Sequence, residues 1–282
     1  MRYGAGFVTL TDKLNLLVTV ILITMEVLLF LFVFFLGASV GSFVNVLIDR
    51  LPIRQSIFLK RSHCAKCKKN LTPLELIPII SYLALRGKCK KCKSKIPTRI
   101  FLVEVTSGLL YSAVFLLYVL RSVDFINLVY LLLLFPVFIG IFFTDLDYGI
   151  IPDELVLLVS SIVFVYLAVY SPNLIINHSL SGVGLLLIFL LIFLTTSGRG
   201  MGFGDVKLSF ALGLFLGFPM TLVSVYLAFL TGATVAIILV LWGKKKLKGD
   251  TIPFGPFLVA SSIATYFFGD VMLRQAIKIL GV

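Results

Sequence analysis

Apolar residues gather into long runs along the chain, and short polar connections separate these runs. Several runs approach or exceed the ~20 residues that a helix needs to cross the hydrocarbon of a bilayer. The pattern therefore predicts an all-α polytopic membrane protein with about eight transmembrane helices. The predicted segments are Leu14–Ile48, Phe101–Leu120, Phe125–Phe143, Leu155–Tyr170, Leu180–Leu194, Val206–Leu216, Met220–Trp242 and Phe254–Phe268.

The sixth run, Val206–Leu216, is short for a span. As a helix it would be roughly 17 Å long, whereas the hydrocarbon is ~30 Å thick. We expect it to begin inside the membrane, after the glycine-rich stretch Ser197–Gly204. Irregular backbone is tolerated at that depth only where protein or a water-filled cavity covers it. This part of the chain is therefore a candidate for a site.

The first run is too long for one ordinary span, and this length suggests how the chain is divided. Met25-Glu26 interrupts the run. We interpret residues 1–24 as an N-terminal extension or as extra helical turns, and residues 25–48 as the first transmembrane helix. Residues 49–100 would form an inserted domain, 101–270 a seven-helix membrane domain, and 271–282 a C-terminal tail.

Composition and charge add an orientation to this picture. Hydrophobic residues make up 60% of the chain, against about half in soluble domains. The net charge is +12, and 14 of the 25 Lys and Arg residues lie between Asp49 and Ile100, together with only two acids. The positive-inside rule places such a segment in the cytoplasm, and anionic lipid would attract it. No RNA- or DNA-binding pattern accompanies the charge, so nucleic acid is not an expected partner.

The other connections follow the same rule. Lys244, Lys245, Lys246 and Lys248 come after the seventh run, whereas Ser171–His178 and Gly217–Pro219 contain no Lys or Arg. Alternation then places residues 49–100, 144–154, 195–205 and 243–252 in the cytoplasm of a multi-pass inner-membrane protein.

The four cysteines lie in the basic segment as two Cys-x-x-Cys pairs, Cys64 with Cys67 and Cys89 with Cys92. A cytosolic location disfavours disulfides. Two such pairs at this separation are typical of a structural zinc site with four thiolate ligands. A small charged domain also gains folding free energy from a bound metal. The alternative is a set of redox-active or incidental thiols.

Acidic residues at span ends are the candidates for chemistry, because carboxylates in or beside a membrane are costly and usually functional. Asp145 lies at the end of the third run and Asp205 at the start of the sixth. The chain crosses the membrane twice between them, so both return to the same face. Two carboxylates held together can act as acid and base in the hydrolysis of an amide. The alternative is that these acids are helix caps or interfacial anchors, which suits Asp153 after Pro152 and remains open for Asp147.

The glycines around Asp205 also have a physical use. Gly202 and Gly204 leave room for a substrate backbone beside the Asp205 carboxylate, and they allow turns with positive φ. We therefore count Gly202, Gly204, Lys207 and Asp147 as substrate-binding or supporting residues.

Several motifs together resemble the type IV prepilin peptidase family, over roughly Met25 to Gly269. They are Gly41–Pro52, the two cysteine pairs, Pro78–Gly87, Thr144–Asp147 with Ile151–Asp153, Gly202–Asp205 and Ile252–Phe257. The resemblance implies a Gly-x-Gly-Asp aspartic peptidase that cuts basic leader peptides from prepilins or pseudopilins. It places the catalytic pair on Asp145 and Asp205. It also implies S-adenosylmethionine-dependent methylation of the new N-terminus, with a donor site along Glu75–Gly87, at Glu75 and Gly87.

Two other functions are compatible with parts of the sequence. One is another Gly-x-Gly-Asp protease, such as a preflagellin-type peptidase, although such relatives generally lack an insertion like residues 49–100. The other is a zinc-ribbon membrane scaffold of a secretion or pilus assembly that catalyses nothing. The scaffold would hold Asp145 and Asp205 apart, whereas a peptidase would bring them into one site.

Overall fold

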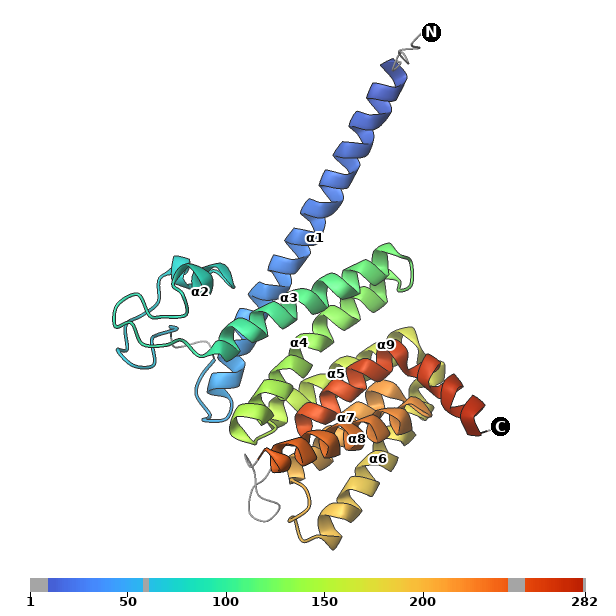
Figure 1. The fold of residues 1–282 in the computed structure, drawn as a ribbon. Helices are drawn as coiled ribbons and strands as arrows, with labels where there is room; N and C mark the ends of the chain where they lie inside the picture. Colours follow the sequence, from blue (N-terminus) through green and yellow to red (C-terminus); the bar gives the residue numbers. More distant parts are fainter. Residues whose placement is uncertain (1–9, 58–60, 243–251, 281–282) are drawn as a thin grey trace.

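The computed structural model describes residues 10–57, 61–242 and 252–280, and this part of the chain is helical (Figure 1). The long helices are α1 (Leu10–Arg50), α3 (Thr98–Val119), α4 (Phe125–Tyr148), α5 (Asp153–Tyr170), α6 (Ile175–Thr195), α7 (Phe203–Leu216), α8 (Met220–Leu241) and α9 (Gly255–Leu280). Short elements lie between them: α2 (Ile80–Ala84) and the 3-10 turns Pro73–Leu76 and Pro172–Leu174. The described residues contain no β-strand, only two isolated bridges.

The predicted fold class is confirmed, and each of the eight predicted runs lies in a helix. Among the residues that the structure describes, seven helices are long and apolar enough to cross a membrane. The eighth, α7, has 14 residues and follows the irregular stretch before Phe203. A count of eight complete spans is therefore not established.

The long helices at the two ends of the chain continue across the expected divisions, which stay predictions. Helix α1 runs without a break through Met25 and Glu26, because glutamate is a good helix former and a single charge does not end a helix. Within α1, residues Thr19–Arg50 are long and apolar enough to cross a membrane. Helix α9 continues to Leu280 and includes most of the predicted C-terminal tail.

Helix α4 is the centre of the bundle. In its apolar stretch 61% of the residues are buried, against 11% to 39% in the other six candidate spans. It packs on α1, α3, α5 and α9. The outer helices turn large apolar side chains outward, such as Leu157, Ile176 and Leu191, as expected where lipid is the solvent.

Close approach of small residues joins α1 to α3. A side chain at Gly41 would come within 2.7 Å of the Ser107 hydroxyl and 2.9 Å of the Val103 carbonyl. Lipid supplies no hydrophobic driving force between helices, so packing at such small residues holds them together. Figure 1 shows α1 crossing α3 and then projecting beyond the rest of the bundle.

Contacts between helix ends define two faces of the bundle. At one end Arg99 of α3 pairs with Asp49 of α1 and Asp147 of α4. At the other end, Tyr170 of α5 donates a hydrogen bond to Asp124, which caps α4. The segment with the cysteines lies beside the first end (Figure 1). The ends of α1 and α4 and the starts of α3, α5, α7 and α9 therefore share one face, which we call the site face.

Candidate active site and metal centre

Asp145 lies in the last two turns of α4, on the site face. Its side chain is buried, with 5% of its surface exposed. Its Oδ2 accepts a hydrogen bond of 2.9 Å from the backbone N–H of Gly255, the first residue of α9. A β-carbon at position 255 would lie 2.6 Å from the same Oδ2, so only glycine leaves room for this contact.

Asp205 lies in the first turn of α7 and is also buried, at 7% exposed. Its Oδ2 accepts a hydrogen bond of 3.1 Å from the backbone N–H of Gly202, the residue that precedes the helix. Its Oδ1 is buried and has no hydrogen-bond partner within the described ranges. One oxygen of Asp205 thus holds the start of its own helix, and the other is available for a ligand.

Gly255, which donates to Asp145, and Gly204, which precedes Asp205, both lie against Ile151, a buried residue in the connection between α4 and α5. A β-carbon at Gly204 would lie 3.1 Å from the Ile151 side chain, and one at Gly255 would lie 3.2 Å from it. The structure therefore brings the two predicted residues together, which is not what a scaffold with separate acids would show.

Gly202 and Gly204 matter at this site because they lack side chains, and their backbone conformations are ordinary. The predicted use of positive φ is wrong for both, because Gly202 has φ −76° and Gly204 is part of α7. Gly198, earlier in the same connection, has φ +72°. The absent side chain of Gly204 is what admits Ile151 between the two helix starts.

Lys207 and Asp153 form an ion pair that joins the second turn of α7 to the first turn of α5. The Lys207 Nζ also lies 5.5 Å from the ring centre of Phe203. The predicted cap at Asp153 is wrong: Pro152 is the N-cap of α5, and Asp153 is its first residue. An acid there still interacts favourably with the helix dipole.

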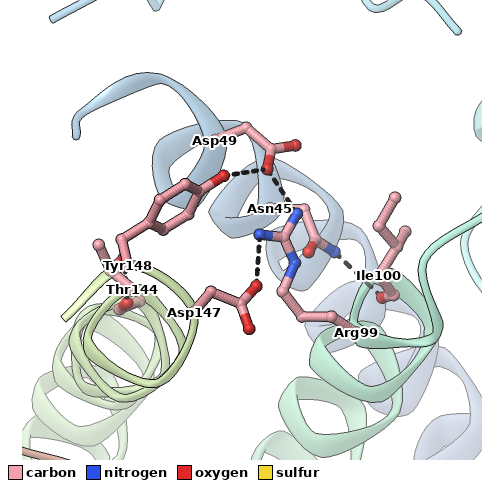
Figure 2. Close-up of polar contacts among 8 residues, drawn as sticks. Asn45, Asp49, Arg99, Ile100, Thr144, Asp147 and Tyr148 are labelled. Carbon is pink, nitrogen blue, oxygen red and sulfur yellow. Dashed lines mark hydrogen bonds and ion pairs between the residues drawn. The ribbon is translucent and has the colours of Figure 1, made fainter. Parts of the chain in front are cut away.

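Asp147, Asp49 and Arg99 form a second polar cluster at the edge of the site face (Figure 2). The Arg99 guanidinium donates to Asp49 Oδ1 at 2.6 Å and to Asp147 Oδ2 at 3.1 Å. Tyr148 points its hydroxyl at the same Asp49 oxygen, 3.4 Å away. Asp147 is thus held by α3 and does not join the Asp145–Asp205 pair.

The four cysteines converge in the segment between α1 and α3. Their sulfur atoms all lie within 4.8 Å of one another, and Cys64 Sγ is 3.8 Å from Cys92 Sγ. A tetrahedral ion with Zn–S bonds of ~2.3 Å would place its sulfur ligands about 3.8 Å apart. The donor set therefore fits a zinc ion.

Both cysteine pairs are built in the same way. Lys68 and Lys93, one residue after each pair, have φ +55° and φ +58° and donate their N–H groups to the Cys64 and Cys89 carbonyls. Hydrogen bonds from the N–H groups of Cys67 and Lys66 lower the pKa of the Cys64 thiol to about 6. This favours the thiolate at Cys64, which is the form that binds metal, whereas burial and the neighbouring thiols raise the pKa of Cys67 to about 11.

Glu75 and Gly87, the predicted donor-binding residues, have structural partners. The Thr72 N–H and the Lys69 ammonium both bind the Glu75 carboxylate and lower its pKa to about 2. Gly87 has φ +64°, and a side chain there would meet the Tyr82 hydroxyl at 3.0 Å. Glu75 is therefore fully engaged and does not fit a role as ligand to S-adenosylmethionine in this conformation.

The sequence alone predicts no role for Gly255, Ile151 or Arg99. Gly255 belongs to the motif Ile252–Phe257 and Ile151 to the motif Ile151–Asp153, and membership in these motifs is the one sequence feature that points to them. Arg99 is one of the many basic residues of segment 49–100, and its neighbours in the sequence do not indicate two acidic partners.

The fold and the site together define a class: a multi-pass helical membrane protein with two buried aspartates and a four-cysteine centre at one end of the bundle. Comparison with known proteins identifies the class further. Residues 35–118 match the model of the Bacterial Peptidase A24 N-terminal domain, and residues 130–237 match that of the Type IV leader peptidase family.

Curated relatives give the same result over most of the chain. The prepilin leader peptidase/N-methyltransferase of Bacillus subtilis is 32% identical, over 87% of this chain and 96% of its own length. Those of Aeromonas salmonicida and Pseudomonas putida are 32% and 30% identical, over 88% and 87% of this chain and 93% of their own lengths. No solved structure gives a significant match. The chain belongs to the type IV leader peptidase family, as the sequence motifs predicted.

Proposed function

We propose that this protein removes the basic leader peptide of type IV prepilins or pseudopilins and that Asp145 and Asp205 carry out the hydrolysis. The observation that carries the proposal is that two buried carboxylates lie on the site face, next to Gly255 and Gly204, which both pack on Ile151. The names of its relatives support the choice of substrate, since each is called a prepilin leader peptidase/N-methyltransferase.

The proposed reaction uses the two carboxylates as one unit. Close carboxylates cannot both ionise easily, so they share a proton. The ionised group takes a proton from water, whose oxygen attacks the carbonyl carbon of the peptide bond to be cut. The protonated group gives its proton to the substrate, and the C–N bond breaks with the amine leaving protonated. The N–H groups of Gly202 and Gly255 each hold one carboxylate oxygen in place, which fixes the direction of the pair.

The test of this function is cleavage of a prepilin by the purified protein in lipid vesicles. Mass spectrometry should find the free leader and a shortened pilin. An intact prepilin after prolonged incubation with folded protein would contradict the proposal.

We also propose that methylation of the new N-terminus follows, with S-adenosylmethionine as donor. The relatives' printed names are its support. The engagement of Glu75 by Lys69 and Thr72 argues that the donor binds elsewhere or after Glu75 is released, so no step is assigned to this residue.

The site face is proposed to lie on the cytoplasmic side of the inner membrane. The basic segment between α1 and α3 adjoins that face, and Lys and Arg favour the cytoplasm. Lys244–Lys248, which supported the same orientation, lie outside the described residues. We expect a cysteine introduced at Asn173, in a variant whose native cysteines are replaced, to react with an impermeant reagent only from outside the cell. Labelling at Asn173 from the cytoplasm alone would reverse the orientation.

The metal proposed for Cys64, Cys67, Cys89 and Cys92 is a single structural zinc ion. Its role would be to hold the two cysteine knuckles together rather than to take part in hydrolysis. Elemental analysis of freshly purified, reduced protein should find one zinc per chain, and Cys64→Ser should lower that content. We expect metal removal to loosen the segment between α1 and α3 while most leader cleavage remains. Preparations without stoichiometric metal would exclude the site.

A further inference from the structure

We propose that Arg99 is a positioning residue for Asp145 and that it acts through Asp147. The inference rests on the proposed function, because it assigns Arg99 a part in the same hydrolysis. Arg99 does not touch the aspartate pair. It holds the helix end on which Asp145 stands.

The geometry joins three helices through one side chain. Arg99 stands in the first turn of α3, Asp49 in the last turn of α1 and Asp147 in the last turn of α4. The Arg99 side chain is 11% exposed, whereas those of Asp49 and Asp147 are 51% and 37% exposed. Figure 2 shows the guanidinium lying between the two carboxylates. A planar guanidinium can bind two carboxylates at once, which a lysine ammonium does less well.

Each of the three charges is unfavourable within its own helix. The N-terminus of a helix repels a cation and its C-terminus repels an anion, because of the helix dipole. Arg99 lies at an N-terminus, whereas Asp49 and Asp147 lie at C-termini. Local propensity thus explains none of the three positions, and their mutual pairing explains all of them. Such disagreement between local preference and structure is expected at functional sites.

The cluster also contains two buried polar atoms that do not stabilise the fold through hydrogen bonds. Arg99 Nε and Asn45 Oδ1 are buried and lack a hydrogen-bond partner among the residues that the structure describes. Asn45 instead uses its amide to donate to the Ile100 carbonyl, one residue after Arg99, at 3.1 Å. The arrangement therefore fixes the first turn of α3 against α1 at some energetic cost.

The path from Arg99 to Asp145 is short. Asp147 is two residues after Asp145, and the helix end closes when Gly149, at φ +64°, donates its N–H to the Asp145 carbonyl. Residues 145–149 therefore move as one turn. Without the Arg99–Asp147 ion pair, that turn loses its charged contact with α3, and any shift of the turn carries the Asp145 carboxylate with it. Displacements of about 1 Å at a reacting group can reduce a rate by about a hundredfold.

The first test is steady-state cleavage of a prepilin by Arg99→Gln and Asp147→Asn. We expect kcat to fall by roughly tenfold to a hundredfold in each, with KM nearly unchanged, because the change misplaces the acid–base pair rather than the substrate. The double variant should be no slower than the worse single one, since both remove the same ion pair. Arg99→Lys should recover part of kcat. Arg274→Gln and Asp270→Asn, exposed positions of the same residue types on α9, are the matched controls and should match the wild type.

The second test does not depend on the reaction. Hydrogen exchange in peptides that cover residues 140–151 should become faster in Arg99→Gln and Asp147→Asn than in the two controls, while the exchange of α8 stays unchanged. Zinc content equal to that of the wild type would show that the variants are folded.

The two tests separate the failure of this inference from that of the proposed function. A wild-type protein that does not cleave prepilins would overturn the proposed function. Hydrogen exchange of residues 140–151 would still test whether Arg99 holds the end of α4 in place. Unchanged exchange at residues 140–151, an unchanged kcat in Asp147→Asn, or a double variant whose losses multiply would each overturn the positioning role.

Discussion

Asp145→Asn and Asp205→Asn should each lower the rate of leader cleavage by orders of magnitude. The asparagine side chain keeps the shape of aspartate and can still accept the backbone hydrogen bonds from Gly255 and Gly202. It cannot exchange a proton with water or substrate. The loss is therefore chemical, and both variants should fold and bind zinc as the wild type does.

The double variant Asp145→Asn with Asp205→Asn should cleave hardly more slowly than either single variant. Residues that act as one unit lose most of their effect when the first is removed. In the proposed mechanism the two aspartates share one proton, so we expect them to titrate as a pair. Methylation of a substrate that has already been cleaved, where it occurs, should survive because it needs neither carboxylate.

The measurement is prepilin cleavage by each variant in lipid vesicles, with Asp270→Asn as the matched control. Asp270 is an exposed acid far along α9 from Gly255. Near-normal cleavage by either active-site variant would refute the aspartyl mechanism, regardless of how the Arg99 and Asp147 variants behave.

Gly255→Ala should be the most damaging change to a residue without a functional side chain. The added methyl group would lie 2.6 Å from Asp145 Oδ2 and 3.2 Å from Ile151 Cδ1. Either the Asp145 carboxylate or the start of α9 must move, and the hydrogen bond from the Gly255 N–H is lost or lengthened. We expect cleavage to fall by about a hundredfold, as for other small displacements of reacting groups.

The control for Gly255→Ala is Gly184→Ala in α6, where an added β-carbon meets nothing within 4 Å. Alanine is the better helix former by about 1 kcal/mol, so this variant should be at least as stable and fully active. Activity in Gly255→Ala equal to that in Gly184→Ala would show that the contact between α9 and Asp145 is not needed.

The sequence predicted the features that depend on local composition. Runs of apolar residues located the helices because length and hydropathy are enough to identify a span. The return of Asp145 and Asp205 to one face followed from counting two crossings. The meeting of the four cysteines followed from their repeated spacing, which matches the two knuckles seen in the structure.

The remaining features depend on how helices pack, which local patterns do not encode. Gly255 is 110 residues from Asp145 in the chain, and their hydrogen bond exists only because α9 begins beside the end of α4. The ion pairs of Arg99 join residues 48 and 50 positions apart. Their partners depend on the rotation of three helices about their axes, whereas hydropathy reports only that each helix is apolar.

The contact between Asp49 and Arg99 also closes the base of the cysteine-containing segment. The chain leaves the membrane bundle at the end of α1 and re-enters it at the start of α3. Because the ion pair holds these two points together, the intervening residues form a closed loop. Lengthening such a loop adds little to the entropy of closing it, about 0.6 kcal/mol for each doubling. A change in the length of this segment therefore costs little in closure entropy while the ion pair keeps the ends of α1 and α3 together.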